Sequence, residues 1–129
     1  MSENLIILGH GSRREAANEE IKAIYNLVKE ANPAWQVTYA FVDFAQPSLE
    51  ERVRELVAKG EKTIVLTPVF LTVGNHLAQG LPKRLKALEE ENPGLELIMA
   101  RHLGADPLIA QLVSKRSAEA MSQINSKMR

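Results

Sequence analysis

The order of apolar and polar residues along the chain changes between two periods, one typical of buried strands and the other of amphipathic helices. Short runs such as residues 5–8 are wholly apolar and rich in β-branched residues, which favours strands covered on both faces. Longer segments carry an apolar residue every three or four positions, which predicts helices with one buried stripe. The pattern predicts four strands, over residues 5–8, 35–42, 63–67 and 95–100. It also predicts four helices: one over residues 13–31, one from Pro47 that stops at Gly60, one from Pro82 that stops at Asn92-Pro93-Gly94, and one from Asp106-Pro107 through Ile124. A polar, basic tail follows the last helix.

Four strands that alternate with four helices predict an α/β fold. Right-handed crossovers give a doubly wound, flavodoxin-like parallel sheet of four strands in the order two, one, three, four, with helices on both faces. The chain has 129 residues, of which 45% are hydrophobic and 25% charged, so we expect a single domain over residues 1–129. The topology reverses between strands one and three, and such sheets bind ligands beyond the carboxyl ends of these two strands.

Composition narrows the classes of function. Sixteen basic and sixteen acidic residues balance, so no net field attracts nucleic acid or an anionic membrane, and we expect neither as a partner. The absence of cysteine excludes disulfides, thiolate catalysis and cysteine-ligated metals, and leaves His and carboxylate side chains as metal ligands. The first apolar run is too short for a signal peptide or a membrane span, so we expect a cytoplasmic protein.

One internal similarity links the two halves of the chain. Residues 30–37 read EANPAWQV and residues 90–97 read EENPGLEL, each at the predicted end of a helix. Duplication of a βαβα unit and a chance match at a common helix stop both explain it, because Asn-Pro is a frequent helix breaker.

The turn after strand one carries the first candidate for chemistry. Glycines flank the histidine in Gly9-His10-Gly11-Ser12-Arg13-Arg14, so the backbone can turn sharply and leave the imidazole uncovered. Ser12 can cap the following helix, whose free amides attract a carboxylate or phosphate. The run matches neither a dinucleotide fingerprint nor a Walker loop, and we expect no nucleotide. The alternative is a tight turn in which His10 only bonds a backbone carbonyl.

The segment after strand three carries a second histidine, His76, behind Pro68-Val69-Phe70-Leu71-Thr72-Val73-Gly74-Asn75. Because strands one and three are neighbours in the predicted sheet, His10 and His76 are expected to face one crevice. Neutral imidazole binds Fe, Co, Ni and Zn and accepts protons near neutral pH. Pro68 and Gly74 argue against a regular strand here, so the apolar side chains between them suit a flat hydrophobic ligand or a partner subunit. The alternative is that the strand continues to Phe70 and these residues are core.

Other polar residues follow the remaining strands or begin the helices. Asp43 follows strand two and His102 follows strand four, each more typical of an ordinary loop residue than of a ligand. Arg13 and Arg14 adjoin the glycine turn and suit an anionic group on a ligand. We interpret Lys83 and Arg84 as solvated charges.

Taken in order, these motifs resemble the class II tetrapyrrole chelatases, and specifically the short-form sirohydrochlorin cobaltochelatases. The resemblance covers nearly the whole chain and rests on Gly9-His10-Gly11-Ser12-Arg13, Ala17-Asn18, Pro47-Ser48-Leu49, Pro68-Val69-Phe70-Leu71, Gly74, His76, Leu103-Gly104 and Asp106-Pro107. It implies insertion of a divalent metal into sirohydrochlorin by a homodimer, with His10 and His76 as the metal-binding and catalytic pair.

Two positions depart from that family pattern. Members often carry an acidic residue four places after the second histidine, where this chain has Gly80. They also often carry Glu near the end of strand two, where this chain has the shorter Asp43, with Gln46 three residues further on. The first departure lowers the negative charge around the expected metal, and the second shortens the acidic side chain.

These residues and the resemblance together give a functional hypothesis. The metal, Co²⁺ or alternatively Fe²⁺ or Ni²⁺, is a substrate held by His10 and His76, with Asp43 as an additional candidate. The tetrapyrrole is expected to contact Gly11, Ser12, Arg13, Arg14, Phe70, Leu71, Val73 and Gly74. The alternatives are a non-catalytic metal- or tetrapyrrole-binding protein of the same family and, less well supported, a flavodoxin-like phosphoacceptor or nucleotide module.

Overall fold

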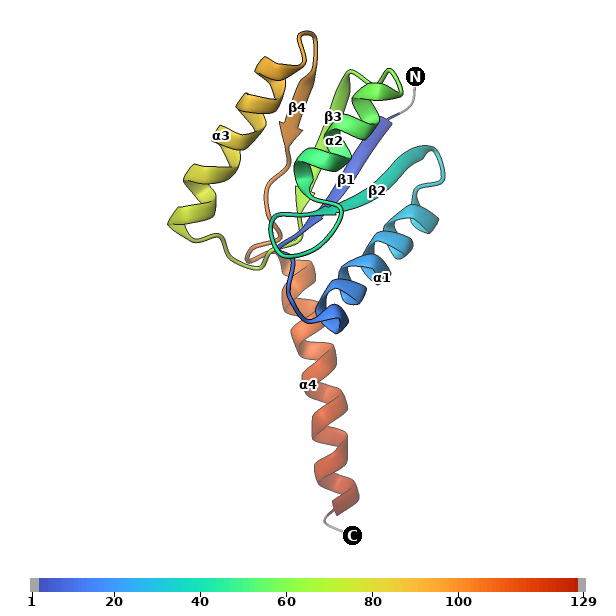
Figure 1. Cartoon of the computed structure of the whole chain (residues 1–129). Coiled ribbons are helices and arrows are strands. Elements are labelled where there is room, and N and C mark those ends of the chain that lie inside the picture. The colour runs from blue at the N-terminus through green and yellow to red at the C-terminus, as the bar shows by residue number, and fades with distance from the viewer. Residues whose placement is uncertain (1–2, 128–129) are drawn as a thin grey trace.

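Strands and helices alternate along the chain, as the sequence pattern predicts. The computed structural model describes residues 3–127, with the side chains of residues 3–124 (Figure 1). In chain order the elements are β1 (Glu3–Gly9), α1 (Glu15–Ala31), β2 (Trp35–Phe41), α2 (Leu49–Ala58), β3 (Thr63–Pro68), α3 (Asn75–Glu91), β4 (Glu96–Met99) and α4 (Pro107–Lys127). None of these helices is long and apolar enough to cross a membrane.

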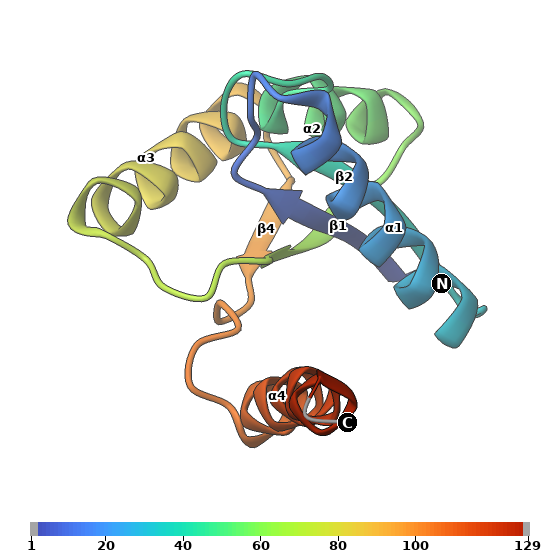
Figure 2. The same ribbon diagram turned by 90° about the horizontal axis from the view of Figure 1, so that it is seen from below.

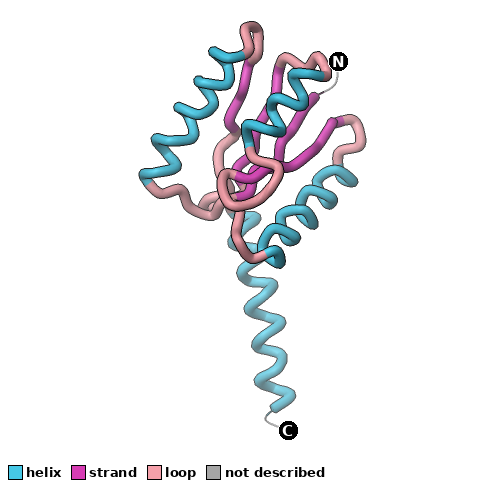
Figure 3. Tube along the Cα trace, viewed as in Figure 1, coloured by secondary structure: helices cyan, strands magenta, loops and turns pink. Residues whose placement is uncertain are grey.

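The four strands form one parallel sheet in the order β2-β1-β3-β4, which confirms the predicted doubly wound topology. Helices α2 and α3 cover one face, where the core includes Ile6, Leu8, Ile64 and Leu66. Helix α1 covers the other face over β1 and β2 only. The loops after the strands gather at the carboxyl edge of the sheet, between the sheet and α4 (Figure 3).

Helix α3 begins earlier than the sequence analysis predicts. The prediction placed its start at Pro82, but it starts at Asn75 and Pro82 lies inside it. The apolar stripe explains the difference. Leu77, Leu81 and Leu85 follow one another at steps of four and pack on the core both before and after Pro82. This packing outweighs the backbone hydrogen bond that a proline cannot donate.

Two other helix starts differ in detail from the prediction. Helix α2 starts at Leu49 because Ser48 forms a capping box with Glu51. Helix α1 starts at Glu15, with Arg14 as its N-cap, so the prediction that Ser12 caps this helix is wrong. The Ser12 hydroxyl instead accepts a hydrogen bond from the amide of Arg14 at 3.0 Å.

The internal similarity corresponds to one capping arrangement used twice. Asn32 ends α1 and Asn92 ends α3, and each side-chain amide donates to the carbonyl four residues earlier at 2.9 Å. Each Asn carbonyl then accepts from the backbone amide three residues later, at 3.0 Å, just before the next strand. The similar residues therefore specify the same helix-to-strand connection in the two halves.

Helix α4 lies apart from the rest of the fold. It extends beyond the carboxyl edge of the sheet, away from the other helices (Figure 1), and the orthogonal view also shows it separated from the strands (Figure 2). The Asp106 carboxylate caps it by accepting a hydrogen bond from the amide of Leu108 at 2.9 Å. The helix continues to Lys127, through most of the segment that the sequence analysis interpreted as a polar tail.

Candidate active site

The segments that follow the strands are joined by backbone hydrogen bonds at the carboxyl edge. The amide of Asp43 donates to the carbonyl of His10 at 2.9 Å, which extends the pairing of β1 and β2 past both strands. The amide of Val69 donates to Leu8 at 2.9 Å, and the amide of Leu103 donates to Phe70 at 3.0 Å. Residues after all four strands therefore meet at the edge where the topology predicts a ligand site.

The turn after β1 requires glycine at two positions. A Cβ at Gly9 would lie 2.8 Å from the side chain of Ile21, so the glycine lets α1 approach the strand closely. Gly11 has a φ of 87°, and a Cβ there would collide with the backbone carbonyl of Asp43. His10 therefore lies between two glycines in close contacts, one with the Ile21 side chain and one with the Asp43 backbone.

A buried amide holds this turn from below. Asn18 of α1 is 4% exposed, and its side chain bonds both backbone groups of Ser12: Oδ1 accepts from the amide and Nδ2 donates to the carbonyl, each at 2.9 Å. A buried polar side chain is stabilising only when it is hydrogen-bonded in this way. The Asn18–Ser12 pair therefore fixes the turn that carries His10.

His10 is exposed and rests on an aromatic ring. Its imidazole stacks on Phe70 with ring centroids 3.8 Å apart and an interplanar angle of 25°. Phe70 lies in the loop after β3, where no strand continues, but its side chain is 2% exposed and belongs to the core. Phe70 therefore belongs to the core beneath His10, and a direct contact between its ring and a flat ligand stays a prediction.

His76 lies in the first turn of α3 and is exposed. Because α3 starts at Asn75, this histidine is part of a helix and not of the loop that the sequence analysis predicted. No hydrogen bond or ring contact joins His10 and His76 within the part of the chain that is described. That the two imidazoles share one metal stays a prediction.

The remaining apolar candidates in the loop after β3 differ in exposure. Leu71 is largely exposed and available to a ligand, whereas Val73 packs partly against the core. Gly74 is the N-cap of α3 and is exposed. The loop thus presents one accessible apolar side chain next to the start of the helix that carries His76.

Arg13 forms a pair with Phe44, a residue that the sequence analysis did not identify as part of the site. The guanidinium carbon of Arg13 lies 4.7 Å from the ring centroid of Phe44, within range of a cation–π contact. Phe44 is 65% exposed and has a φ of 64°, which is rare for a residue with a side chain. Together with Ser12 and Gln46 this pair lines a hollow of about 360 Å³ beside the β1 turn. An aromatic residue directly after Asp43 was the available signal.

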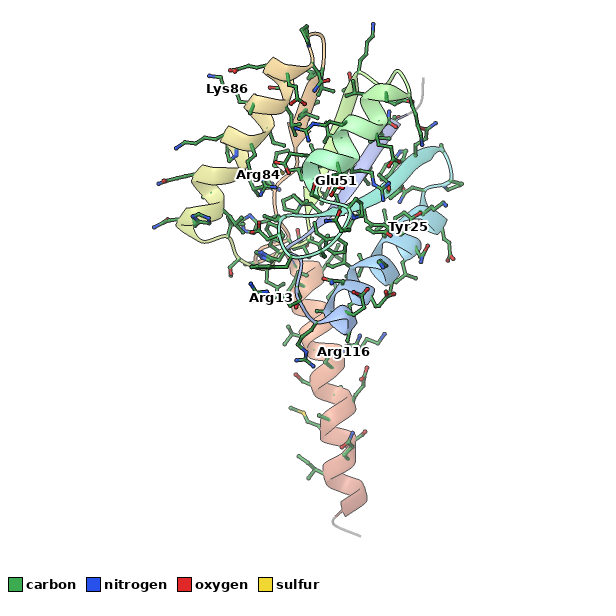
Figure 4. The ribbon with its side chains drawn as sticks, viewed as in Figure 1. Arg13, Tyr25, Glu51, Arg84, Lys86 and Arg116 are labelled. Carbon is green, nitrogen blue, oxygen red and sulfur yellow. The ribbon has the colours of Figure 1, made fainter. Side chains whose placement is uncertain are left out.

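The other charged candidates have separate roles. Arg84 forms a bidentate ion pair with Glu50 of α2, at 2.8 Å to each carboxylate oxygen, and also donates to the carbonyl of Val42 at 3.2 Å. Figure 4 shows its side chain reaching from α3 toward α2. This hydrogen-bonded pair lowers the pKa of Glu50 and raises the pKa of Arg84. Arg84 thus fastens α3 to α2, and the interpretation of it as a solvated charge is wrong.

Asp43, His102 and Lys83 are exposed at or near this edge. His102 lies in the linker before α4, which lines a hollow of about 670 Å³. Among the residues that the structure describes, no three His, Asp or Glu side chains come close enough together to enclose a metal ion.

Known proteins are similar to this chain in sequence and in fold. A family model described as CbiX matches residues 4–120. The sirohydrochlorin cobaltochelatase of Methanosarcina acetivorans is 34% identical over 131 residues, covering 94% of this chain and 100% of that protein. The corresponding cobaltochelatase of Methanopyrus kandleri is 29% identical, covering 92% and 97%.

A chloroplastic sirohydrochlorin ferrochelatase of Arabidopsis thaliana is 27% identical over 95% of this chain and 55% of its own length. The crystal structure of a cobalamin biosynthesis CbiX protein from Marinobacter aquaeolei superposes with a TM-score of 0.83 at 24% identity, covering 94% of this chain and 98% of that one. The two structures therefore share one fold over nearly the whole length of each chain. The family match over residues 4–120 and the 34% identity to a fully covered relative show that the chain belongs to the CbiX family.

Proposed function

We propose that this protein inserts a divalent metal ion into sirohydrochlorin. The observation that carries the proposal is the exposed imidazole of His10, held by two glycines and by the Asn18–Ser12 pair at the edge where doubly wound sheets bind ligands. The names of the relatives in Methanosarcina acetivorans and Arabidopsis thaliana supply the substrate and support the reaction class.

The chemistry suits imidazole. Metal insertion requires an aquo ion to lose water while the macrocycle loses two pyrrole N–H protons. A neutral imidazole can ligate the ion and can also accept a proton near neutral pH. We assign His10 both roles and assign His76 the role of second ligand, with Asp43 as an additional candidate because its amide bonds the His10 carbonyl.

Open coordination favours transfer over storage. A closed cage of His and carboxylate groups would hold the ion tightly, whereas a site with few protein ligands keeps positions for water and for the ring nitrogens. The absence of a third clustered His, Asp or Glu side chain among the described residues supports this interpretation.

The side chains around the turn suit the rest of the substrate. Peripheral carboxylates of sirohydrochlorin would meet Arg13, Arg14 and the backbone amides of Gly11 and Ser12. Exposed Leu71 and the neighbouring segment through Gly74 would contact the apolar surface of the macrocycle. Val73 contributes a partly covered side chain to the same segment.

We assign Co²⁺ as the metal because the relatives in Methanosarcina acetivorans and Methanopyrus kandleri, both covered over nearly their whole length, are named cobaltochelatases, with Fe²⁺ and Ni²⁺ as the tested alternatives. Imidazole accepts all three, so metal supply in the cell contributes to the choice. We also propose that the protein acts in the cytoplasm as a homodimer.

A second candidate function is binding without turnover. The observation that favours it is Gly80, which stands one helical turn after His76 where family members often carry an acidic side chain. In that case the protein would bind metal or tetrapyrrole stoichiometrically and form no metallated product.

An anaerobic absorbance assay tests these two functions. Sirohydrochlorin is mixed with Co²⁺, Ni²⁺ or Fe²⁺ and with wild-type protein, His10→Ala, His76→Ala or no protein. His102→Ala is the matched control, because His102 is exposed on the same side of the sheet but belongs to the linker before α4. We expect metallation above the blank, a fall of at least about 100-fold in His10→Ala and wild-type rates in His102→Ala.

A wild-type rate equal to the blank would refute the chelatase proposal. Stoichiometric binding of metal or tetrapyrrole in the same samples would then support the second function. Where wild-type protein metallates above the blank, an equal rate in His10→Ala would remove His10 from the mechanism.

A further inference from the structure

Helix α3 carries His76 at its start, but its polar contacts with other elements lie further along. Among the described residues, three side chains of α3 form such contacts: Arg84, Glu89 and Glu91. Glu91 pairs with Arg54 of α2 at 2.8 Å, and Glu89 accepts from a backbone amide of β4 at 2.8 Å. Figures 1 and 2 both show α3 diverging from the sheet toward its start. The end of α3 is therefore fastened more firmly than the turn that carries His76.

Distance along the helix gives this difference its importance. At a rise of about 1.5 Å per residue, Glu91 lies about 22 Å from His76, and Arg84 lies about 12 Å from it. A tilt of about 10° about the contact at Glu91 would move His76 by about 4 Å, roughly twice the length of a metal–nitrogen bond. Leu77 and Leu81 pack near this end, but apolar contacts are not directional and do not fix a tilt. Of the polar contacts described for α3, the one at Arg84 is thus the best placed to hold His76.

The guanidinium of Arg84 reaches the edge of the sheet as well as α2. Besides its two bonds to Glu50, it donates to the carbonyl of Val42, directly after β2, at 3.2 Å. The amide of Val42 donates to the last residue of β1 at 2.9 Å, and the next amide, that of Asp43, donates to the carbonyl of His10 at 2.9 Å. Arg84 is therefore bonded to the short segment that is itself paired with the turn carrying His10.

This arrangement suits a guanidinium and not an ammonium group. Nε and Nη2 of Arg84 donate to the two carboxylate oxygens of Glu50, and Nη2 also donates to Val42, so one rigid fork holds three acceptors. The side chains of Arg84 and Glu50 are 31% and 26% exposed, against 53% and 48% for Arg54 and Glu91. The Arg84 pair is thus the better protected of the two ion pairs that join α2 and α3 in the described part of the chain.

We propose that Arg84 is a positioning residue for His76. It fixes the tilt of α3 against the segment after β2, and so sets the separation between His76 and the turn that carries His10. In this role Arg84 contacts neither the metal nor the tetrapyrrole and acts through the helix. The role rests on the proposed function, in which both imidazoles ligate one metal ion, but its geometry can be measured without metal or substrate.

A distance measurement on the full chain tests the geometry. The chain has no cysteine, so Ala16→Cys in α1 and Ala78→Cys in the first turn of α3 provide two exposed sites for nitroxide labels. The label in α1 reports on the His10 turn, because Asn18 of the same helix bonds that turn. Doubly labelled chain is diluted with excess unlabelled chain of the same variant, so that double electron–electron resonance reports distances within one chain.

Arg54→Met is the matched control for Arg84→Met. It removes a bidentate ion pair between the same two helices but leaves the carbonyl of Val42 bonded. We expect the distance distribution to widen at least about twofold in Arg84→Met and to keep its wild-type width in Arg54→Met. An unchanged width in Arg84→Met, or equal widening in both variants, would overturn the positioning role.

Titration calorimetry with Co²⁺ alone separates positioning from charge. Arg84→Met leaves the Glu50 carboxylate unpaired beside the segment after β2, and this negative charge would by itself strengthen the binding of a divalent cation. Loss of positioning instead lowers the effective concentration of one imidazole at an ion held by the other, so we expect Co²⁺ affinity to fall at least about tenfold. Arg54→Met should bind Co²⁺ as the wild type does.

The two measurements distinguish failure of this role from failure of the proposed function. Unchanged or tighter Co²⁺ binding in Arg84→Met, beside a wild type that binds Co²⁺, would overturn only the role of Arg84. A wild type that binds no Co²⁺ would refute the shared metal ion, and with it any role of Arg84 in positioning a ligand, whatever the distances.

Discussion

Replacing Asn18 by Ala should loosen the turn that carries His10 and lower stability by a measurable amount. The Asn18 side chain is buried and forms two 2.9 Å hydrogen bonds, one to the amide and one to the carbonyl of Ser12. Each bond contributes about 0.5–1.5 kcal/mol net, so their joint loss costs about 1–3 kcal/mol. Ser12 is only half-buried, so water can bond the amide and carbonyl that lose their partner. We therefore expect a loss of stability of about 2 kcal/mol, near the middle of this range.

The expected change in melting temperature follows from the chain length. A chain of 129 residues has an unfolding entropy of about 270 cal/mol/K, so a loss of 2 kcal/mol lowers Tm by about 7 °C. Under the proposed function, kcat should also fall by about one order of magnitude, because the imidazole is less well positioned. Differential scanning calorimetry gives the first quantity and the sirohydrochlorin absorbance assay gives the second.

Asn26→Ala is the matched control, because Asn26 lies exposed on the same helix. Both substitutions change helix propensity equally, so the difference between the two Tm values isolates the hydrogen bonds to Ser12. Equal Tm values for the two variants would refute the reasoning, since the Asn18–Ser12 pair would then contribute nothing to stability.

Three further predictions concern charge and backbone geometry. Gly80→Glu puts a carboxylate one helical turn from His76, in space that is open to a Cβ, and should tighten Co²⁺ binding in calorimetric titration by roughly tenfold, equivalent to 1.4 kcal/mol. Gly11→Ala forces a side chain into a φ of 87° and into a backbone carbonyl, and should lower stability in urea by about 3 kcal/mol. Arg84 holds the pKa of Glu50 below its usual 4.5, so the pair stabilises the fold above pH 4.5 and this stabilisation is lost as the pH falls through the folded-state pKa. The stability difference between wild type and Glu50→Gln should therefore narrow below about pH 4.5 in urea unfolding.

Each of these variants has a control of the same residue type. Gly80→Ala gains helix propensity without charge, and equal Co²⁺ affinity in Gly80→Ala and Gly80→Glu would contradict the electrostatic reason. Gly94 has a φ of 91° but open space around it, so Gly94→Ala should cost less than Gly11→Ala. Glu90 is exposed, and a pH dependence of Glu90→Gln equal to that of Glu50→Gln would contradict the assignment to the ion pair.

Periodicity was sufficient to predict the sheet, because each strand is a short segment of apolar or alternating residues and each helix has an apolar stripe. The strongest local signal in α3, Pro82, indicated the wrong start for this helix. Pro82 usually marks a first turn, but Leu77 and Leu81 extend the buried stripe upstream of it. Tertiary packing decided the boundary, and only the four-residue spacing of these leucines hinted at it.

Of the candidate site, the sequence indicated the glycine-flanked His10 because backbone geometry is encoded locally. It did not indicate the contacts that depend on distant segments. Phe70 stacks under His10 across two strands, and Arg84 pairs with Glu50 across two helices. Likewise, the apolar stripe of α4 predicted a helix, but the period of that stripe does not say that the helix lies apart from the sheet.

The hydrogen bond from the Asp43 amide to the His10 carbonyl has a consequence for timescales. It continues the β1–β2 pairing to the histidine itself, so the His10 backbone moves with the central strand and not as a free loop. The movements left to the imidazole are rotations of its own side chain, which take picoseconds to nanoseconds at exposed positions, whereas loop rearrangements are slower. A metal ion leaving His10 for an adjacent ring would therefore wait for ligand exchange and not for the protein to open.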